Sequence, residues 1–147
     1  MDQQRFRRLS DDFYVAPQLA AEDFAAAAAL GIKTVLNNRP DGEDPSQLQS
    51  DAAARAAAEA GLAYHYLPVP SGGMSLEHVE AERVAIEEAQ GPFLAYCRSG
   101  TRSCHLWAFV KAGSRPVEEI VAAAAAAGYD LQPAAQTIRT LATRNAS

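Results

Sequence analysis

Three short apolar segments, each preceded by a helix-forming segment, place the strongest constraint on the fold of this chain. β-branched and aromatic residues make these segments typical of buried strands, and they are IKTVLNN (32–38), LAYHYLPV (62–69) and PFLAYC (92–97). The helix-forming segments before them are rich in alanine or amphipathic and cover 20–31, 47–61 and 75–90. This alternation predicts an α/β fold in which a mainly parallel central sheet is flanked by helices.

The rest of the chain extends the same pattern without a linker or a repeat. Residues 6–9 and 12–16 predict two further short strands joined at Ser10–Asp11. Helices are expected at 102–113, 116–129 and 133–144, two of them begun by proline. We therefore expect a single domain over 1–147. Parallel strands would bring the loops NNRPDGED, PVPSGGMS and CRSGTRS together at one edge of the sheet.

Composition limits the partners and the compartment. A net charge of −5 argues against nucleic acid or an anionic membrane as the main partner. The N-terminus lacks the apolar core of a signal peptide, and the alanine tracts are too short and too weakly hydrophobic to span a bilayer. Two cysteines and three histidines without zinc-ligand spacing predict free thiols, a cytoplasmic location, and neither a metal nor a cofactor.

The loop CRSGTRS has the chemistry of an anion site with a nucleophile. Cys97 ends a strand and Arg102 opens a helix, so the helix N-terminus and loop N–H groups favour the thiolate. Such surroundings lower the pKa of a thiol from about 8.5 to between roughly 3.5 and 7.5. Cys97 is the predicted nucleophile, and Arg102 is predicted to bind the anion through two donors. The predicted substrate-binding residues around them are Arg98, Ser99, Gly100, Thr101 and Ser103, the last as a hydroxyl donor to the thiolate.

The loop NNRPDGED offers further groups for the same site. Asp41 is the first choice for a catalytic carboxylic acid, although Glu43 or Asp44 would serve if the loop folds over Cys97. Arg39 is a candidate for binding the substrate anion. Asn37 and Asn38 are expected to be structural residues that cap the end of the strand.

Most other residues near the cysteine loop are expected to have structural roles. Trp107 and His105 are expected to pack behind the loop. Cys104 is expected to be a core residue, with resolution of an oxidised Cys97 as the alternative. Gly72 and Gly73 leave open N–H groups that would line a substrate entrance.

The motif AYCRSGTRSCHLW, with NNRPDGEDP upstream and APQL near the start, resembles a family of bacterial phosphatase-like domains. The resemblance covers about 6–130. It implies the fold of cysteine-dependent tyrosine and dual-specificity phosphatases. Members of this family occur alone, fused to β-lactamase-like hydrolases, or with sulfide:quinone oxidoreductases, which implies association with sulfide-oxidising enzymes. The resemblance leaves the reaction open, because members are described as phosphatases and as sulfurtransferases.

Two departures from the phosphatase pattern favour sulfur transfer. Only four residues separate Cys97 from Arg102, whereas cysteine phosphatases have five, and a smaller ring of N–H groups suits a single persulfide sulfur. The loop PVPSGGMS contains no carboxylate to protonate a leaving group. We therefore expect a sulfurtransferase that forms a persulfide on Cys97 and passes the sulfur to a thiol such as glutathione. The alternatives are a phosphatase acting through a phosphocysteine and an inactive anion-binding module.

Overall fold

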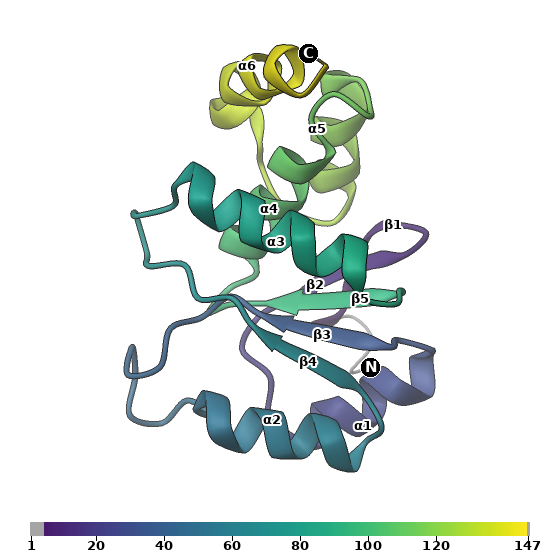
Figure 1. Cartoon of the computed structure of the whole chain (residues 1–147), viewed down its shortest axis with the longest axis vertical. Helices are drawn as coiled ribbons and strands as arrows, with labels where there is room; N and C mark the ends of the chain where they lie inside the picture. The colour runs from purple at the N-terminus through teal and green to yellow at the C-terminus, as the bar shows by residue number, and fades with distance from the viewer. Residues whose placement is uncertain (1–4, 147) are drawn as a thin grey trace.

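A five-stranded sheet lies between two layers of helices in the computed structural model, which describes residues 5–146 (Figure 1). The strands are β1 (Arg7–Ser10), β2 (Phe13–Ala16), β3 (Thr34–Asn37), β4 (Ala63–Tyr66) and β5 (Phe93–Tyr96). Their order across the sheet is β1-β2-β5-β3-β4. Strands β2, β5, β3 and β4 are parallel, and only β1 is antiparallel to its neighbour. The predicted α/β fold with a mainly parallel sheet is confirmed.

Helices α1 and α2 cover one face of the sheet, and α3 and α4 cover the other, with α5 and α6 packed beyond α4 (Figure 1). Their bounds are α1 (Ala21–Leu30), α2 (Ser50–Glu59), α3 (Leu76–Glu88), α4 (Thr101–Lys111), α5 (Val117–Ala126) and α6 (Ala135–Ala146). A 3-10 turn at Gln132–Ala134 precedes α6. The helices match the predicted segments closely. Strands β3, β4 and β5 are shorter than their apolar segments because the ends of each segment leave the ladder, and β1 is shifted by one residue from the predicted 6–9. None of the helices described is long and apolar enough to cross a membrane.

Burial on both faces explains why the central strands are continuously apolar. Every residue of β3 and β5 is buried, whereas β4, at the edge of the sheet, is partly exposed. Val35 and Leu94 belong to the core beneath α1 and α2. Their neighbours Leu36 and Ala95 face the opposite core, which contains the fully buried Trp107. Side chains that alternate between two cores are what a covered parallel sheet requires.

The carboxyl ends of the parallel strands meet at the left edge of the sheet in Figure 1. The loops after β3, β4 and β5 converge there. Arg102, at the start of α4, donates to the carbonyl of Val69 and to the carboxylate of Glu43. One side chain thus joins the three loops. The predicted convergence of these loops is confirmed.

Candidate active site

Cys97 immediately follows β5, and its side chain is completely buried beneath the loop that leads into α4. The backbone N–H of Gly100 donates to Cys97 Sγ at 3.1 Å. The loop is also attached to the strand end at Ala16, whose carbonyl accepts from Cys97 N at 3.4 Å, and Gln18 N donates to the carbonyl of Arg98 at 3.1 Å. The APQL segment therefore forms one wall of the cysteine loop.

Gly100 is required by both the conformation and the packing of this loop. Its φ is 94°, in the left-handed region that residues with a side chain rarely adopt. A Cβ at this position would collide with the hydroxyl of Tyr129 and approach the carbonyl oxygen of Ala16 to 3.3 Å. The same tyrosine hydroxyl donates to the carbonyl of Ser99 at 3.1 Å. Tyr129 thus supports the loop from outside.

A carboxylate from the loop after β3 lies between two guanidinium groups. Arg102 Nη1 and Nη2 donate to Glu43 Oε2 and Oε1 at 2.8 and 2.9 Å, and Nη1 also donates to the carbonyl of Val69 at 2.8 Å. Arg39 Nε donates to Glu43 Oε1 at 2.9 Å, while its Nη1 donates to Gln18 Oε1 at 3.0 Å. The two arginines therefore converge on one anionic group.

The opposite charges in this cluster stabilise the ionised forms of Glu43 and Arg102. The hydrogen bond from Arg102, with that from Arg39, lowers the pKa of Glu43 against the opposing effect of burial. The pKa of Arg102 is raised chiefly by Glu43, and the neighbouring Cys97 contributes in the same direction. Cys97, Arg102 and Arg39 are thus brought together as predicted from the sequence, whereas their roles in catalysis and binding stay predictions.

Asp41 is engaged away from these arginines. Its Oδ1 accepts from the backbone N–H of Ser50, the first residue of α2, at 2.7 Å, and its own N–H donates to the Tyr66 hydroxyl at 2.8 Å. Asp44 likewise accepts from the backbone and hydroxyl of Ser46. The residue that contacts Arg102 is Glu43. A catalytic role for Asp41 stays a prediction that no contact in the structure supports.

Replacing Asp41 with alanine is expected to lower stability and to leave turnover unchanged. The variant loses the acceptor for an N–H at the start of α2, which typically costs about 1 kcal/mol. Urea unfolding and steady-state kinetics check the two effects, with Asp44→Ala as the control from the same loop. A large fall in turnover with unchanged stability would instead assign Asp41 to the reaction.

The Ser103 hydroxyl, expected to donate to the thiolate, donates instead to Asn38 Oδ1 at 2.8 Å. Asn38 Nδ2 in turn donates to Glu82 Oε1 at 2.9 Å and to the carbonyl of Leu67 at 3.1 Å. Ser103, Asn38 and Glu82 are all buried. Because both amide hydrogens of Asn38 have acceptors, its oxygen must face Ser103. This network joins α3 and the end of β3 to the first turn of α4, next to Arg102.

The buried Glu82 makes stability depend on pH. Burial raises the pKa of Glu82 to about 7, and the hydrogen bond from Asn38 only partly opposes this shift. Because the folded state holds the proton more tightly than the unfolded state, the stabilising contribution is complete below the unfolded pKa. It is lost as pH rises towards 7, by about 3 kcal/mol in total.

A Glu82→Gln variant is therefore expected to show a weaker fall in unfolding free energy between pH 5 and pH 8. Chemical denaturation across this range measures the difference. Glu87→Gln, on the exposed side of α3, is the matched control and should keep the wild-type pH dependence. Identical slopes for Glu82→Gln and the wild type would contradict the assignment.

The remaining predicted residues have packing roles or line a nearby cavity. Cys104 is fully buried, and burial together with Cys97 raises the pKa of its thiol to about 12. Trp107 packs in the same core. His105 is half-buried, and its Nδ1 lies 2.8 Å from the carbonyl oxygen of Thr101.

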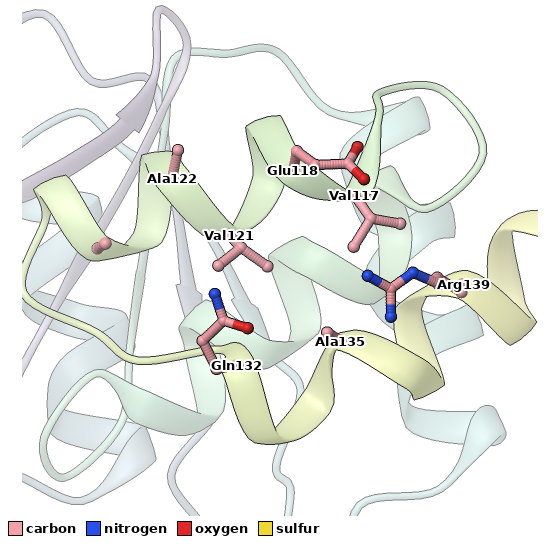
Figure 2. A pocket seen from close by; sticks show the side chains of 8 residues that line it. Val117, Glu118, Val121, Ala122, Gln132, Ala135 and Arg139 are labelled. Carbon is pink, nitrogen blue, oxygen red and sulfur yellow. The ribbon is translucent and has the colours of Figure 1, made fainter.

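Of two cavities in the structure, one borders the cysteine loop and the other does not. A cavity of about 520 Å³ lies beside the cysteine loop, between residues 70–74 and the exposed side of α4, and includes Gly72, Arg98 and Arg102 in its lining. A separate pocket of about 290 Å³ lies between α5 and α6, where Val121 and Arg139 line it (Figure 2). The second pocket contains no residue of the cysteine loop. Among residues 5–146, no three histidine, cysteine or acidic side chains gather where they could hold a metal ion.

Two residues of this site, Gln18 and Glu82, are not predicted from the sequence. Glu43 is predicted there only as an alternative acid. The APQL motif was a usable signal for Gln18. The signal for Glu82 was its position three residues after Val79 and four before Ile86, on the apolar face of α3.

Comparison with known proteins places this geometry in a family. Residues 5–114 match the family model of the phosphatase-like domain of β-lactamase hydrolase-like proteins. A β-lactamase hydrolase-like protein of Xylella fastidiosa is 34% identical over 125 residues, which are 84% of this chain and 29% of that protein. The chain thus spans under a third of the length of this relative.

Solved structures agree with this match. A candidate phosphatase from Neisseria meningitidis has a TM-score of 0.83 and 37% identity, and the similarity covers 93% of this chain and 98% of that one. TpbA of Pseudomonas aeruginosa, solved in complex with phosphotyrosine, has a TM-score of 0.71 at 17% identity, covering 100% and 93% of the two chains. The fold is therefore that of cysteine-dependent tyrosine phosphatases, and the chain belongs to the family of phosphatase-like domains found in β-lactamase hydrolase-like proteins.

Proposed function

We propose that this chain is a phosphatase that hydrolyses phosphate monoesters with Cys97 as the nucleophile. The observation that carries the proposal is the position of Cys97 beside Arg102, in a loop whose Gly100 N–H points at the sulfur, within a phosphatase-like family. A thiolate that receives an N–H hydrogen bond and lies near a guanidinium is suited to attack phosphorus.

The neighbouring cations supply what phosphoryl transfer needs besides a nucleophile. The transferred group carries negative charge on its equatorial oxygens, so positioned donors accelerate the reaction. Arg102 is held in place by the bonds of Nη1 and Nη2 to Glu43 and to Val69, which leaves its Nε and one Nη2 hydrogen to interact with Cys97 and with a phosphate oxygen. In this role Glu43 is a positioning residue, because it orients Arg102 and Arg39 together.

Sulfur transfer, which the sequence favours, is the second candidate. Two observations support it: the four-residue interval between Cys97 and Arg102, and the absence of a carboxylate from the loop at 70–75. In this reaction Cys97 would carry a persulfide, and a thiol such as glutathione would accept the sulfur. Association with sulfide-oxidising enzymes belongs to the same proposal.

One experiment separates the two reactions. Purified protein is given p-nitrophenyl phosphate with and without vanadate, and, separately, thiosulfate followed by cyanide, with Cys97→Ser as the control. Vanadate-sensitive hydrolysis without thiocyanate supports the phosphatase. Thiocyanate release without hydrolysis would overturn it in favour of sulfur transfer. Thermal stabilisation by anions with neither activity would identify an anion-binding module.

A further inference from the structure

A shallow groove of about 560 Å³ lies between α3 and β4, the last strand at one edge of the sheet. His65 of β4 and Leu67, which follows the strand, line it from the sheet, and Ala81 and Val84 line it from α3. Its lining contains no residue of the cysteine loop. The groove is therefore separate from the candidate active site.

The backbone of β4 is paired on one side only, where it meets β3 (Figure 1). The N–H groups of Ala63 and Leu67 donate to carbonyls of the β3 segment at 3.0 and 2.8 Å. Because the backbone groups of successive strand residues point to opposite sides, those of Tyr64 and Tyr66 face away from the sheet. Such a free row of N–H and C=O groups can pair with an added strand.

Exposed apolar side chains gather on the two elements that border this groove. Among residues 5–146, the exposed large hydrophobic residues are Tyr66 on β4 and Leu76 and Val84 on α3, at 39, 49 and 41% exposure. Val84 lines the groove itself. Apolar residues that gather around one groove indicate a surface for another protein, whereas singly scattered ones do not.

The rim of the groove on α3 is acidic. Glu77, Glu80 and Glu88 are exposed and line it, at positions that share one side of the helix with Val84. Glu80 contacts Arg83 at 3.3 Å, whereas neither Glu77 nor Glu88 has an ion pair within the described part of the chain. Two uncompensated carboxylates thus lie about 16 Å apart along the helix axis, with the apolar floor between them.

We propose that this groove binds an extended segment of another protein, which adds to the sheet beside β4 and carries a basic residue on each side of an apolar one. Side chains on one face of a strand recur about every 6.6 Å, so basic residues at the first and fifth positions span about 13 Å. Their long side chains can then reach Glu77 and Glu88, while the apolar residue between them contacts Val84. A second copy of this chain fits poorly, because pairing two β4 edges would bring two acidic rims together. The proposal does not depend on which reaction Cys97 performs.

The test is an NMR titration of the isotope-labelled chain with the peptide GKTVTKG and with its charge-reversed form GETVTEG. We expect GKTVTKG alone to shift the amide signals of β4 and α3, to slow hydrogen exchange at Tyr64 and Tyr66, and to bind more weakly as salt rises from about 50 to about 300 mM. Combining Glu77→Gln with Glu88→Gln should weaken binding by roughly 2–30-fold. Glu87→Gln, exposed on α3 but outside the groove, should bind the peptide as the wild type does.

Four results would each overturn the proposal, and the same spectra show whether the variants are folded. Equal binding of the two peptides would exclude recognition by charge. Binding without slower exchange at Tyr64 and Tyr66 would show that the peptide does not join the sheet. The absence of shifts at about 1 mM GKTVTKG would exclude a peptide site. Self-association of the chain through β4 would assign this edge to a second copy.

Discussion

A Cys97→Ser variant is expected to lose at least about four orders of magnitude in turnover of an aryl phosphate. A serine hydroxyl stays protonated at neutral pH, and no described side chain is placed to act as its base, so the step at phosphorus loses its nucleophile. Steady-state kinetics with p-nitrophenyl phosphate measure the loss. The stability of the variant should stay close to that of the wild type, since the side chain keeps its size.

The second cysteine provides the control for this result. Cys104 lies in the core, and burial with the neighbouring Cys97 raises the pKa of its thiol to about 12. Cys104→Ala should therefore retain turnover, even if it is less stable because a small cavity forms. Equal loss of turnover in the two variants would show that the reaction does not depend on Cys97 alone.

An Arg102→Lys variant is expected to lower kcat/KM by about 10²–10³-fold. Lysine keeps the positive charge but cannot bind Glu43 through two nitrogens and reach the carbonyl of Val69 as well. The loss should fall mainly on kcat, because the donor is needed most when charge develops on the phosphoryl oxygens.

Arg98→Lys is the matched control for Arg102→Lys. Arg98 is exposed on the same loop and has no ion pair to Glu43, so its replacement should cause a much smaller loss. Both substitutions keep the positive charge, so if Arg98→Lys is as damaging as Arg102→Lys, the loss does not come from the contacts of Arg102 with Glu43 and Val69.

The fold could be predicted because its determinants are local. The buried strands β3 and β5 appear in the sequence as apolar runs, and Gly31 ends α1 in the left-handed conformation that a helix C-terminus favours. The convergence of three loops follows from parallel strands alone. These features require no knowledge of how any particular side chain is directed.

The site was harder to predict because its contacts depend on the paths of loops. Asp41 and Glu43 are two residues apart, and only the backbone between β3 and α2 determines which carboxylate faces Arg102. Ser103 finds its acceptor on Asn38, 65 residues away in sequence. Hydrophobic periodicity indicates which side of an element is buried, but it does not identify such partners.

The support of the cysteine loop by Tyr129 bears on how much of the chain is needed for a working domain. The family match ends at residue 114, yet the Tyr129 hydroxyl bonds to Ser99, and Arg7 lies 5.9 Å from the tyrosine ring while donating to the carbonyl of Ala127 at 2.8 Å. Strand β1 and the segment after α5 are therefore in contact behind the loop. A chain truncated at residue 114 would keep every residue of the cysteine loop but lose the Tyr129 contact that supports this loop. The shortest fragment expected to keep the shape of the loop therefore extends past residue 129.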